Sequence, residues 1–178
     1  MMPKRKKLNL LVESVANMNK LFLLLLGLLP LASQALLADR DQPIEVEAHA
    51  VTIDEKNGVS HYLGAAKVVQ GSLLLSAEEV RVFHTQRTVN KVVAKGSSKQ
   101  RAHYQQAQPN QVRFIQADAQ NITYLINKQW VHLKGDAHLV QGFDSFSGGV
   151  LDYDIKNDKV IASKSKDGTQ RVRFKIKL

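Results

Sequence analysis

Paired carboxylates are the residues of this sequence best suited to acid–base chemistry. Asp152 and Asp154 lie two positions apart in an alternating apolar pattern, and Glu78 and Glu79 are adjacent. Two carboxyl groups at a suitable separation can hydrolyse a glycosidic bond. Both pairs lie beside turn signals, however, and this position favours solvated surface over a catalytic site.

Other catalytic and metal-binding signals are weak. The sequence has no Gly-Lys dipeptide of a P-loop, no G-x-S-x-G, no H-E-x-x-H and no cysteine. Its six histidines are scattered. His61 and His132 recur at the spacing of an internal repeat, which favours a shared strand position over a metal site. The sequence therefore predicts a protein that is not an enzyme, with no cofactor and no metal.

A second group of residues has the chemistry to hold a lipid. Each buried methylene contributes about 0.8 kcal/mol, so a row of apolar side chains can bind acyl chains without a specific motif. The same side chains could instead fill a closed core, and the sequence leaves that alternative open. The candidate inward, lipid-binding positions are Ile44, Val46, Leu75, Phe83, Phe114, Ile122, Tyr124 and Phe146.

Basic residues provide a possible complement to these apolar positions. Lysine and arginine can bind phosphate groups and sugars, or can simply form a solubilising face. Of these two interpretations the solubilising face is favoured. The candidates for phosphate contacts are Lys67, Arg81, Lys134, Arg171 and Arg173.

An internal repeat defines the elements that must position these residues. Residues 64–71 (GAAKVVQG) match residues 135–142 (GDAHLVQG) at an offset of 71 positions, and the match extends upstream to His61 and His132. A repeat of this length indicates one supersecondary unit used twice around a shared core. Each unit reads as extended strands separated by turns, with no helical period.

The rest of the pattern predicts an all-β protein. Residues 44–50 alternate, and the parity changes near Ala50, which indicates a bulge or bend. Turn signals such as Lys56-Asn57-Gly58 recur every 8–12 residues, which predicts roughly a dozen short strands. Exposed loops are expected at residues 97–100 and 105–111. Residues 171–178 alternate cations with apolar side chains, which predicts a regular last strand.

The first 35 residues predict a secretory signal peptide. Basic residues precede a short apolar run at residues 21–29, and Ser33-Gln34-Ala35 offers a cleavage pattern, with cleavage after Ala38 also possible. The run is about half the roughly 20 residues that spanning a bilayer requires, which disfavours a retained anchor.

The mature chain is expected to be one exported domain over residues 40–178. Without the five basic residues and one acidic residue of the leader, the net charge falls from +9 to about +5. The absence of cysteine is typical of a bacterial periplasm.

Several short stretches occur in an order that matches one known family: Asp41-Gln42-Pro43-Ile44, Gly64 to Gly71, Ser76-Ala77-Glu78, the second repeat, and the ending from Lys159 to Arg173. On these residues the chain resembles the LptA/OstA-like family of periplasmic lipopolysaccharide-transport proteins. The resemblance implies an open, V-shaped β-jellyroll of two repeated units, with exposed edge strands at both ends, in a Gram-negative periplasm. In one departure, an inward aromatic residue of the family falls on His103.

The resemblance also implies a ligand and partners. The ligand would be lipopolysaccharide, held through its lipid A moiety. The protein would bridge an LptC-like inner-membrane protein and an LptD-like outer-membrane protein. Unpaired edge strands would allow pairing with these partners and with further copies, head to tail. The expected edges are Ile44, Glu45, Val46 and Glu47 at one end, and Val172, Arg173, Phe174, Lys175 and Ile176 at the other.

Two other functions compete with lipid transport. A structural adaptor that carries no lipid would share the edges, and co-purification or crosslinking of lipopolysaccharide would distinguish it. A polyanion or nucleic-acid binder would gather exposed aromatics beside basic residues. Aromatics form only 6% of the chain and lie mostly at apolar-parity positions, so no nucleic-acid partner is expected.

Overall fold

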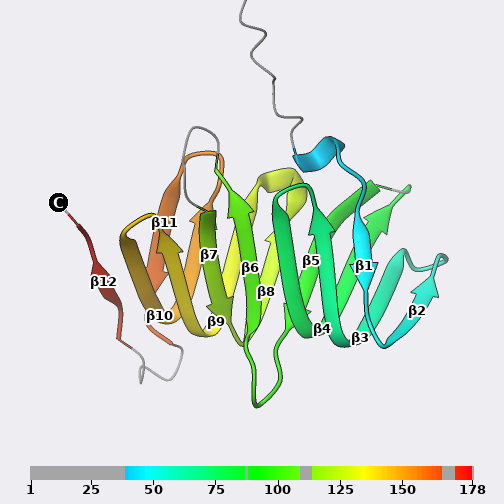
Figure 1. Cartoon of the computed structure of the whole chain (residues 1–178), viewed down its shortest axis with the longest axis horizontal. Helices are drawn as coiled ribbons and strands as arrows, with labels where there is room; N and C mark the ends of the chain where they lie inside the picture. Colours follow the sequence, from blue (N-terminus) through cyan, green and yellow to red (C-terminus); the bar gives the residue numbers. More distant parts are fainter. Residues whose placement is uncertain (1–38, 87, 109–113, 166–170, 178) are drawn as a thin grey trace, which may run out of the picture. The chain divides into compact units, whose positions relative to one another are not determined.

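The computed structural model of the 178-residue chain describes residues 39–86, 88–108, 114–165 and 171–177 (Figure 1). The expected signal peptide and both cleavage positions lie outside these residues. Across the described part of the chain, no helix combines the length and apolar character needed to cross a membrane.

Strands dominate the described residues, and every recorded strand pair is antiparallel. The prediction of an all-β fold with about a dozen strands is confirmed. The elements are η1 (Asp39–Asp41), β1 (Glu45–Glu47), β2 (Ala50–Asp54), β3 (Val59–Gln70), β4 (Leu73–Thr85), β5 (Thr88–Lys95), β6 (Ala102–Ala107), β7 (Phe114–Ala119), β8 (Asn121–Leu125), η2 (Ile126–Lys128), β9 (Trp130–Gln141), β10 (Asp144–Asp154), β11 (Lys159–Ser163) and β12 (Arg173–Lys175).

Two expected boundaries are wrong. Residues 105–107, expected in a loop, complete β6, because they pair with β7. The last strand is shorter than expected, because among the described residues 171–177 only Arg173–Lys175 pair with β10.

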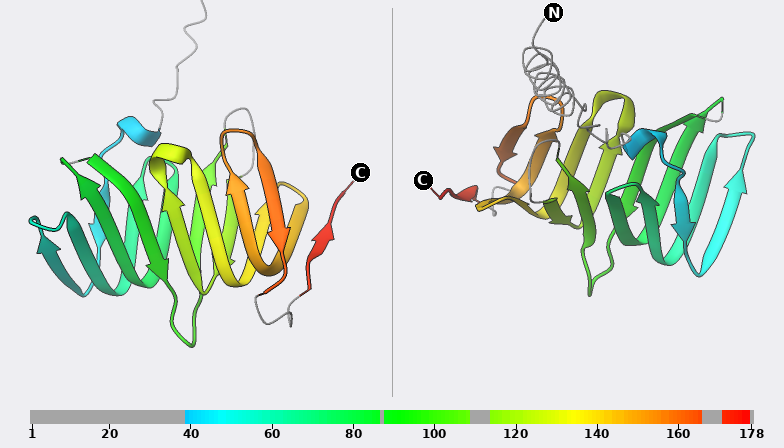
Figure 2. Two further views of the ribbon diagram at one scale, coloured as in Figure 1. Left: turned by 180° about the vertical axis from the view of Figure 1, so that it is seen from behind. Right: turned by 45° about the horizontal axis from the view of Figure 1, so that its top comes forward.

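The four long strands β3, β4, β9 and β10 connect two layers of eight strand segments each (Figures 1 and 2). In layer 1, one half of each long strand pairs in a row with β1, β6, β7 and β12. In layer 2, the other halves pair with β2, β5, β8 and β11. This exchange of strands between two antiparallel layers is a jellyroll arrangement.

Glycines of the repeat form equivalent bends where β3 and β9 pass between the layers. Gly64 and Gly135 have φ angles of 78° and 80°, and the residues after them are also left-handed. A Cβ on Gly64 would lie 2.6 Å from His49 Nδ1, and one on Gly135 would lie 2.8 Å from Gln120 Cγ. Only glycine meets both conditions without strain. The predicted repeat is therefore visible as two copies of one bend.

Apolar side chains from both layers form one core. Tyr104 of layer 1 and Tyr124 of layer 2 meet edge to face, with ring centroids 6.1 Å apart. Aromatic pairs prefer this geometry, and burial of both rings stabilises the contact between the layers. The middle of the interior is therefore filled by side chains.

Candidate functional site

One apolar row crosses the inner face of layer 1 from edge to edge. Cross-strand partners share a face of the sheet, so the strand register defines the row. Its central members are almost fully buried, whereas Phe174 at the end is 68% exposed. The row is Val46, Val68, Leu75, Tyr104, Ala117, Leu139, Phe146 and Phe174.

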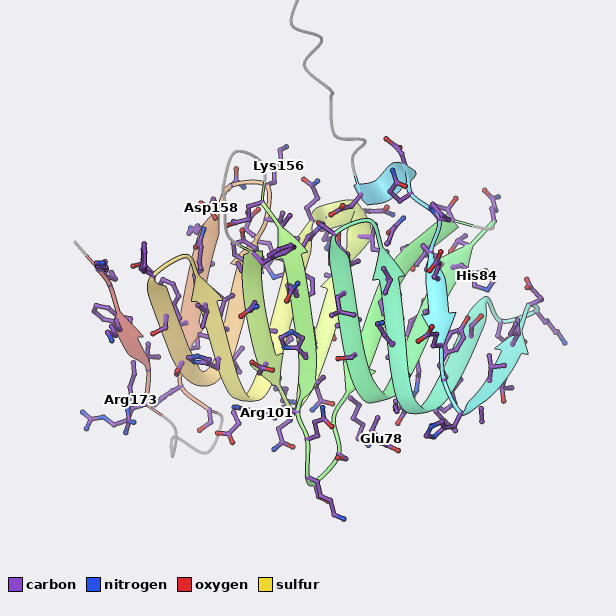
Figure 3. All side chains as sticks on the ribbon, in the orientation of Figure 1. Glu78, His84, Arg101, Lys156, Asp158 and Arg173 are labelled. Atoms are coloured by element: carbon purple, nitrogen blue, oxygen red, sulfur yellow. The ribbon has the colours of Figure 1, made fainter. Side chains whose placement is uncertain are left out.

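The interior opens at the end formed by β1 and β2. A pocket of about 440 Å³ lies there, within the size range of small-molecule sites. We call it the β1–β2 mouth. Its lining residues are Ile44, Val46, Glu55, Ser60, Tyr62, Val82, His84 and Val89, with His84 labelled in Figure 3.

Strand β2 adds apolar surface beside the mouth. Val51 and Ile53 pair with Tyr62 and Ser60, both of which line the pocket. Ile53 is nevertheless 58% exposed. Large apolar side chains that share a face with a pocket and remain exposed mark a surface for an apolar ligand or partner. The mouth therefore combines an apolar wall with a few polar groups from Glu55, Ser60 and His84.

A hydrogen-bond network connects the two layers in the second repeat. Gln141 Nε2 and the Tyr153 hydroxyl donate to Asp158 Oδ1, at 2.6 and 3.1 Å. Gln108 Nε2 donates to the same oxygen at 3.1 Å and also to the Tyr153 hydroxyl. Burial, together with the nearby Asp158 carboxylate, raises the pKa of Tyr153, so this hydroxyl stays a donor at neutral pH.

The far end of the interior, at β12, also has apolar side chains open to solvent. Phe174 pairs with the half-buried Phe146 of β10. Val172 and Ile176, which flank Phe174 at the same parity, are exposed. Ile44, directly before β1, is also exposed, so exposed apolar side chains are found at both ends of layer 1.

The structure distributes the predicted lipid-binding residues over three environments. Ile44 and Val46 line the β1–β2 mouth. Leu75, Ile122 and Tyr124 lie in the packed core. Phe146 lies against the core near the β12 end.

For Phe83 and Phe114 the expected inward placement is wrong. Their neighbours Val82 and Ile115 are buried at the inward parity, so both phenylalanines face outward. Phe83 lies under the Lys91 ammonium, 3.8 Å from the ring centroid, and Phe114 is 43% exposed.

His103 is not the inward residue at its position. Its Nδ1 atom lies 2.9 Å from Asp118 Oδ1 on the outer face, and the buried aromatic is the next residue, Tyr104. The shift of one residue moves the side chain to the other face of the strand. Sequence reasoning also missed Tyr62, Val82 and Val89 of the mouth. The alternation of Val80 and Val82 is the signal that could have identified Val82.

Three of the four carboxylates considered for hydrolysis have structural partners, and the fourth, Glu78, is exposed. Asp152 Oδ1 accepts hydrogen bonds from Trp130 Nε1 and His132, at 3.0 and 2.7 Å. Asp154 accepts from the side chain and backbone of Asn157, and these bonds lower the pKa of Asp154. Within the described residues, no three His, Asp or Glu side chains are grouped as metal ligands.

The two outer strands of layer 1 each have one recorded neighbour among the described residues. Strand β1 pairs with β3, and β12 pairs with β10. Glu45 and Glu47 flank the inward Val46, whereas Arg173 and Lys175 flank Phe174. One edge therefore presents outward carboxylates and the other presents outward cations.

Two bent antiparallel layers around an apolar interior define a β-jellyroll domain. Residues 45–159 match the sequence model of the family described as "LptA/(LptD N-terminal domain) LPS transport protein". The chain belongs to this family.

Named relatives agree with this assignment. The chain is 30% identical over 131 residues to the lipopolysaccharide export system protein LptH of Pseudomonas aeruginosa, covering 74% of each chain. It is 29% identical over 132 residues to LptA of Escherichia coli K12, covering 74% of this chain and 70% of LptA. The crystal structure of LptH from Pseudomonas aeruginosa, described as the LptA-homologous periplasmic component of a conserved lipopolysaccharide transport device, is similar to this chain with a TM-score of 0.72 and 27% identity. That match covers 80% of this chain and all of LptH.

Proposed function

We propose that this protein is a periplasmic carrier of lipopolysaccharide that binds lipid A acyl chains at the β1–β2 mouth. The observation that carries the proposal is the apolar pocket lined by Ile44, Val46 and Tyr62 at an open end of the interior. The names of the relatives support lipopolysaccharide as the ligand. Acyl chains need apolar surface more than directed hydrogen bonds, and the mouth provides it.

In this function the protein links an LptC-like inner-membrane protein to an LptD-like outer-membrane protein. The exposed apolar side chains at both ends of layer 1, including Phe174 and Ile176, support pairing through edge strands. Such pairing would join the interiors of successive domains. Chemistry on the lipid is not part of the proposal, since Asp152 and Asp154 are engaged in hydrogen bonds within a strand pair and a turn.

Photo-crosslinking tests the mouth. A photoreactive amino acid at Ile44 or Val46 should capture lipopolysaccharide, because both side chains line the pocket. The matched control is Glu45, which lies between them and is exposed. Equal labelling at all three positions, or labelling at none, would contradict lipid binding at the mouth.

The adaptor alternative is tested by the same sample. A structural adaptor would assemble through its edges and yield no lipopolysaccharide adduct at Val46. A carrier should yield the adduct whether or not partner proteins are present.

A further inference from the structure

A second concavity involves the outer face of layer 1, which is the opposite face from the apolar interior. Its volume is about 580 Å³. His138, Ser147 and Arg173 are adjacent in the register of β9, β10 and β12, and Ala137 beside His138 is buried inward. We call this concavity the arginine trough. Its lining residues are Arg101, Asp136, Ala137, His138, Ser147, Gly148, Arg171 and Arg173.

Positive charge dominates the trough. Three of its lining residues are arginines and one, Asp136, is acidic. No carboxylate lies within ion-pair distance of Arg101, Arg171 or Arg173 in the described residues. Figure 3 shows Arg101 and Arg173 toward the same, lower edge of the domain.

Two side chains of the trough are held in place by hydrogen bonds. Arg101 Nη1 donates to the backbone oxygen of Asp136 at 2.9 Å, which positions the guanidinium and leaves its other N–H groups for a ligand. His138 Nδ1 lies 2.8 Å from Ser147 Oγ, so Nε2 is the remaining polar atom of this imidazole. Arg101 is the last residue of the β5–β6 connection and lies far in sequence from Arg173, so the fold brings these two cations into one pocket.

We propose that the arginine trough binds a phosphomonoester group, carried either by a soluble sugar phosphate or by a lipid head group. Planar guanidinium groups form paired, charge-assisted hydrogen bonds with phosphate oxygens. The trough volume falls within the range of about 300–1,000 Å³ typical of small-molecule sites, so a phosphorylated sugar fits better than a lone ion. The proposal does not depend on lipid binding at the β1–β2 mouth.

Binding of two probes tests the proposal. The soluble probe is glucose 1-phosphate, followed by calorimetry. The lipid probe is a phosphatidylcholine vesicle with or without phosphatidic acid, followed by co-sedimentation. The double variant Arg101→Gln/Arg173→Gln should weaken binding of at least one probe by about tenfold or more, because two charge-assisted contacts are lost.

The matched control is Lys95→Gln/Lys159→Gln, which removes two positive charges from exposed positions of layer 2. Its binding should stay within about twofold of wild type, because it changes net charge but not the trough. Arg173→Gln alone leaves the Arg101–Asp136 bond intact and should still weaken binding, which separates ligand loss from local misfolding.

The outcome also identifies the source of the phosphate. Selective loss of glucose 1-phosphate binding indicates a soluble ligand, and selective loss of phosphatidic-acid-dependent sedimentation indicates a head group. The proposal is overturned if wild type binds neither probe, or if the control double variant loses as much affinity as the trough variant.

Discussion

Asp39 joins the segment before β1 to layer 1 through a single carboxylate. Its Oδ1 atom accepts the Ser72 backbone N–H at 2.7 Å. Its Oδ2 atom accepts the Ser72 hydroxyl at 2.6 Å and Gln106 Nε2 at 2.7 Å. Burial alone would raise the pKa of Asp39, but the hydrogen bonds from Ser72 and Gln106 outweigh it and lower the pKa below 3.8.

Asp39→Asn should therefore destabilise the protein by about 1–2 kcal/mol at neutral pH, because an amide oxygen cannot replace both acceptors. A folded-state pKa below the unfolded value means that the carboxylate stabilises the fold above pH 3.8. This stabilisation is lost as the pH falls through the folded pKa. Urea unfolding across pH measures the effect. A difference between wild type and variant that stays constant into strong acid would contradict the assignment.

The positions of Phe83 and Phe114 show that residue type alone does not predict which face of a strand a side chain occupies. Phe83 and Phe114 were expected inside because they are large and apolar, yet strand parity places them outside. Parity depends on where each bend falls, and one residue of shift reverses the face. The placement of Val46 was easier to predict, since Glu45 and Glu47 on either side require the outer face.

At the scale of elements, Gly135 in the bend of β9 differs from Gly142, which lies in a turn. Gly135 and Gly142 both have positive φ angles, 80° and 60°. A Cβ at Gly135 would lie 2.8 and 2.9 Å from Gln120 side-chain atoms, whereas a Cβ at Gly142 would meet nothing within 4 Å. Both positions therefore require a positive φ angle, but only Gly135 also lacks space for a Cβ atom.

Gly142→Ala should cost about 1 kcal/mol, the ordinary penalty of a left-handed alanine. Gly135→Ala should cost at least about 1 kcal/mol more, because the Gln120 side chain must also move. Chemical denaturation of both variants measures the two free energies of unfolding. Equal losses would show that the contact with Gln120 does not constrain the bend.

The internal repeat made the two equivalent bends predictable from the sequence. The packing of one layer against the other was not predictable. The 71-residue offset pairs Gly64 with Gly135 and His49 with Gln120, and both pairs form the same bend contact. The Tyr104–Tyr124 contact was hidden, because it joins different layers and no local pattern encodes the opposite layer. The β1–β2 mouth was only half predicted for the same reason: Ile44 and Val46 come from layer 1, and Tyr62 and Val82 come from layer 2.

At the scale of the whole domain, two outer rows of layer 1 connect a carboxylate to a cation. One row runs from Glu47 on β1 to Arg173 on β12, and its neighbour runs from Glu45 to Lys175, each through the paired positions of six intervening strand segments. In the proposed head-to-tail assembly, continued register would place Lys175 of one copy beside Glu45 of the next. Opposite charges at such positions contribute about 0.2–1 kcal/mol per pair.

Charge exchange tests this register. Glu45→Lys and Lys175→Glu should each weaken concentration-dependent assembly in light scattering, because like charges would meet at the junction. The double variant should recover much of the assembly. Neither residue lines the arginine trough or the β1–β2 mouth. Truncation after Gln170 removes β12 and should abolish assembly. Wild type that remains monomeric at high concentration would contradict edge pairing altogether.

The even number of strand segments in each layer has a geometric consequence. Neighbouring segments alternate in direction, so the first and last segments of an eight-segment layer run oppositely. A second copy can then continue the antiparallel alternation without being inverted, which an odd number would not permit. Each added copy would advance the row by about 38 Å at the usual strand spacing of about 4.8 Å. Any assembly built this way has one polarity and a constant distance between successive copies. Its two ends are therefore chemically different, one formed by β1 and the other by β12.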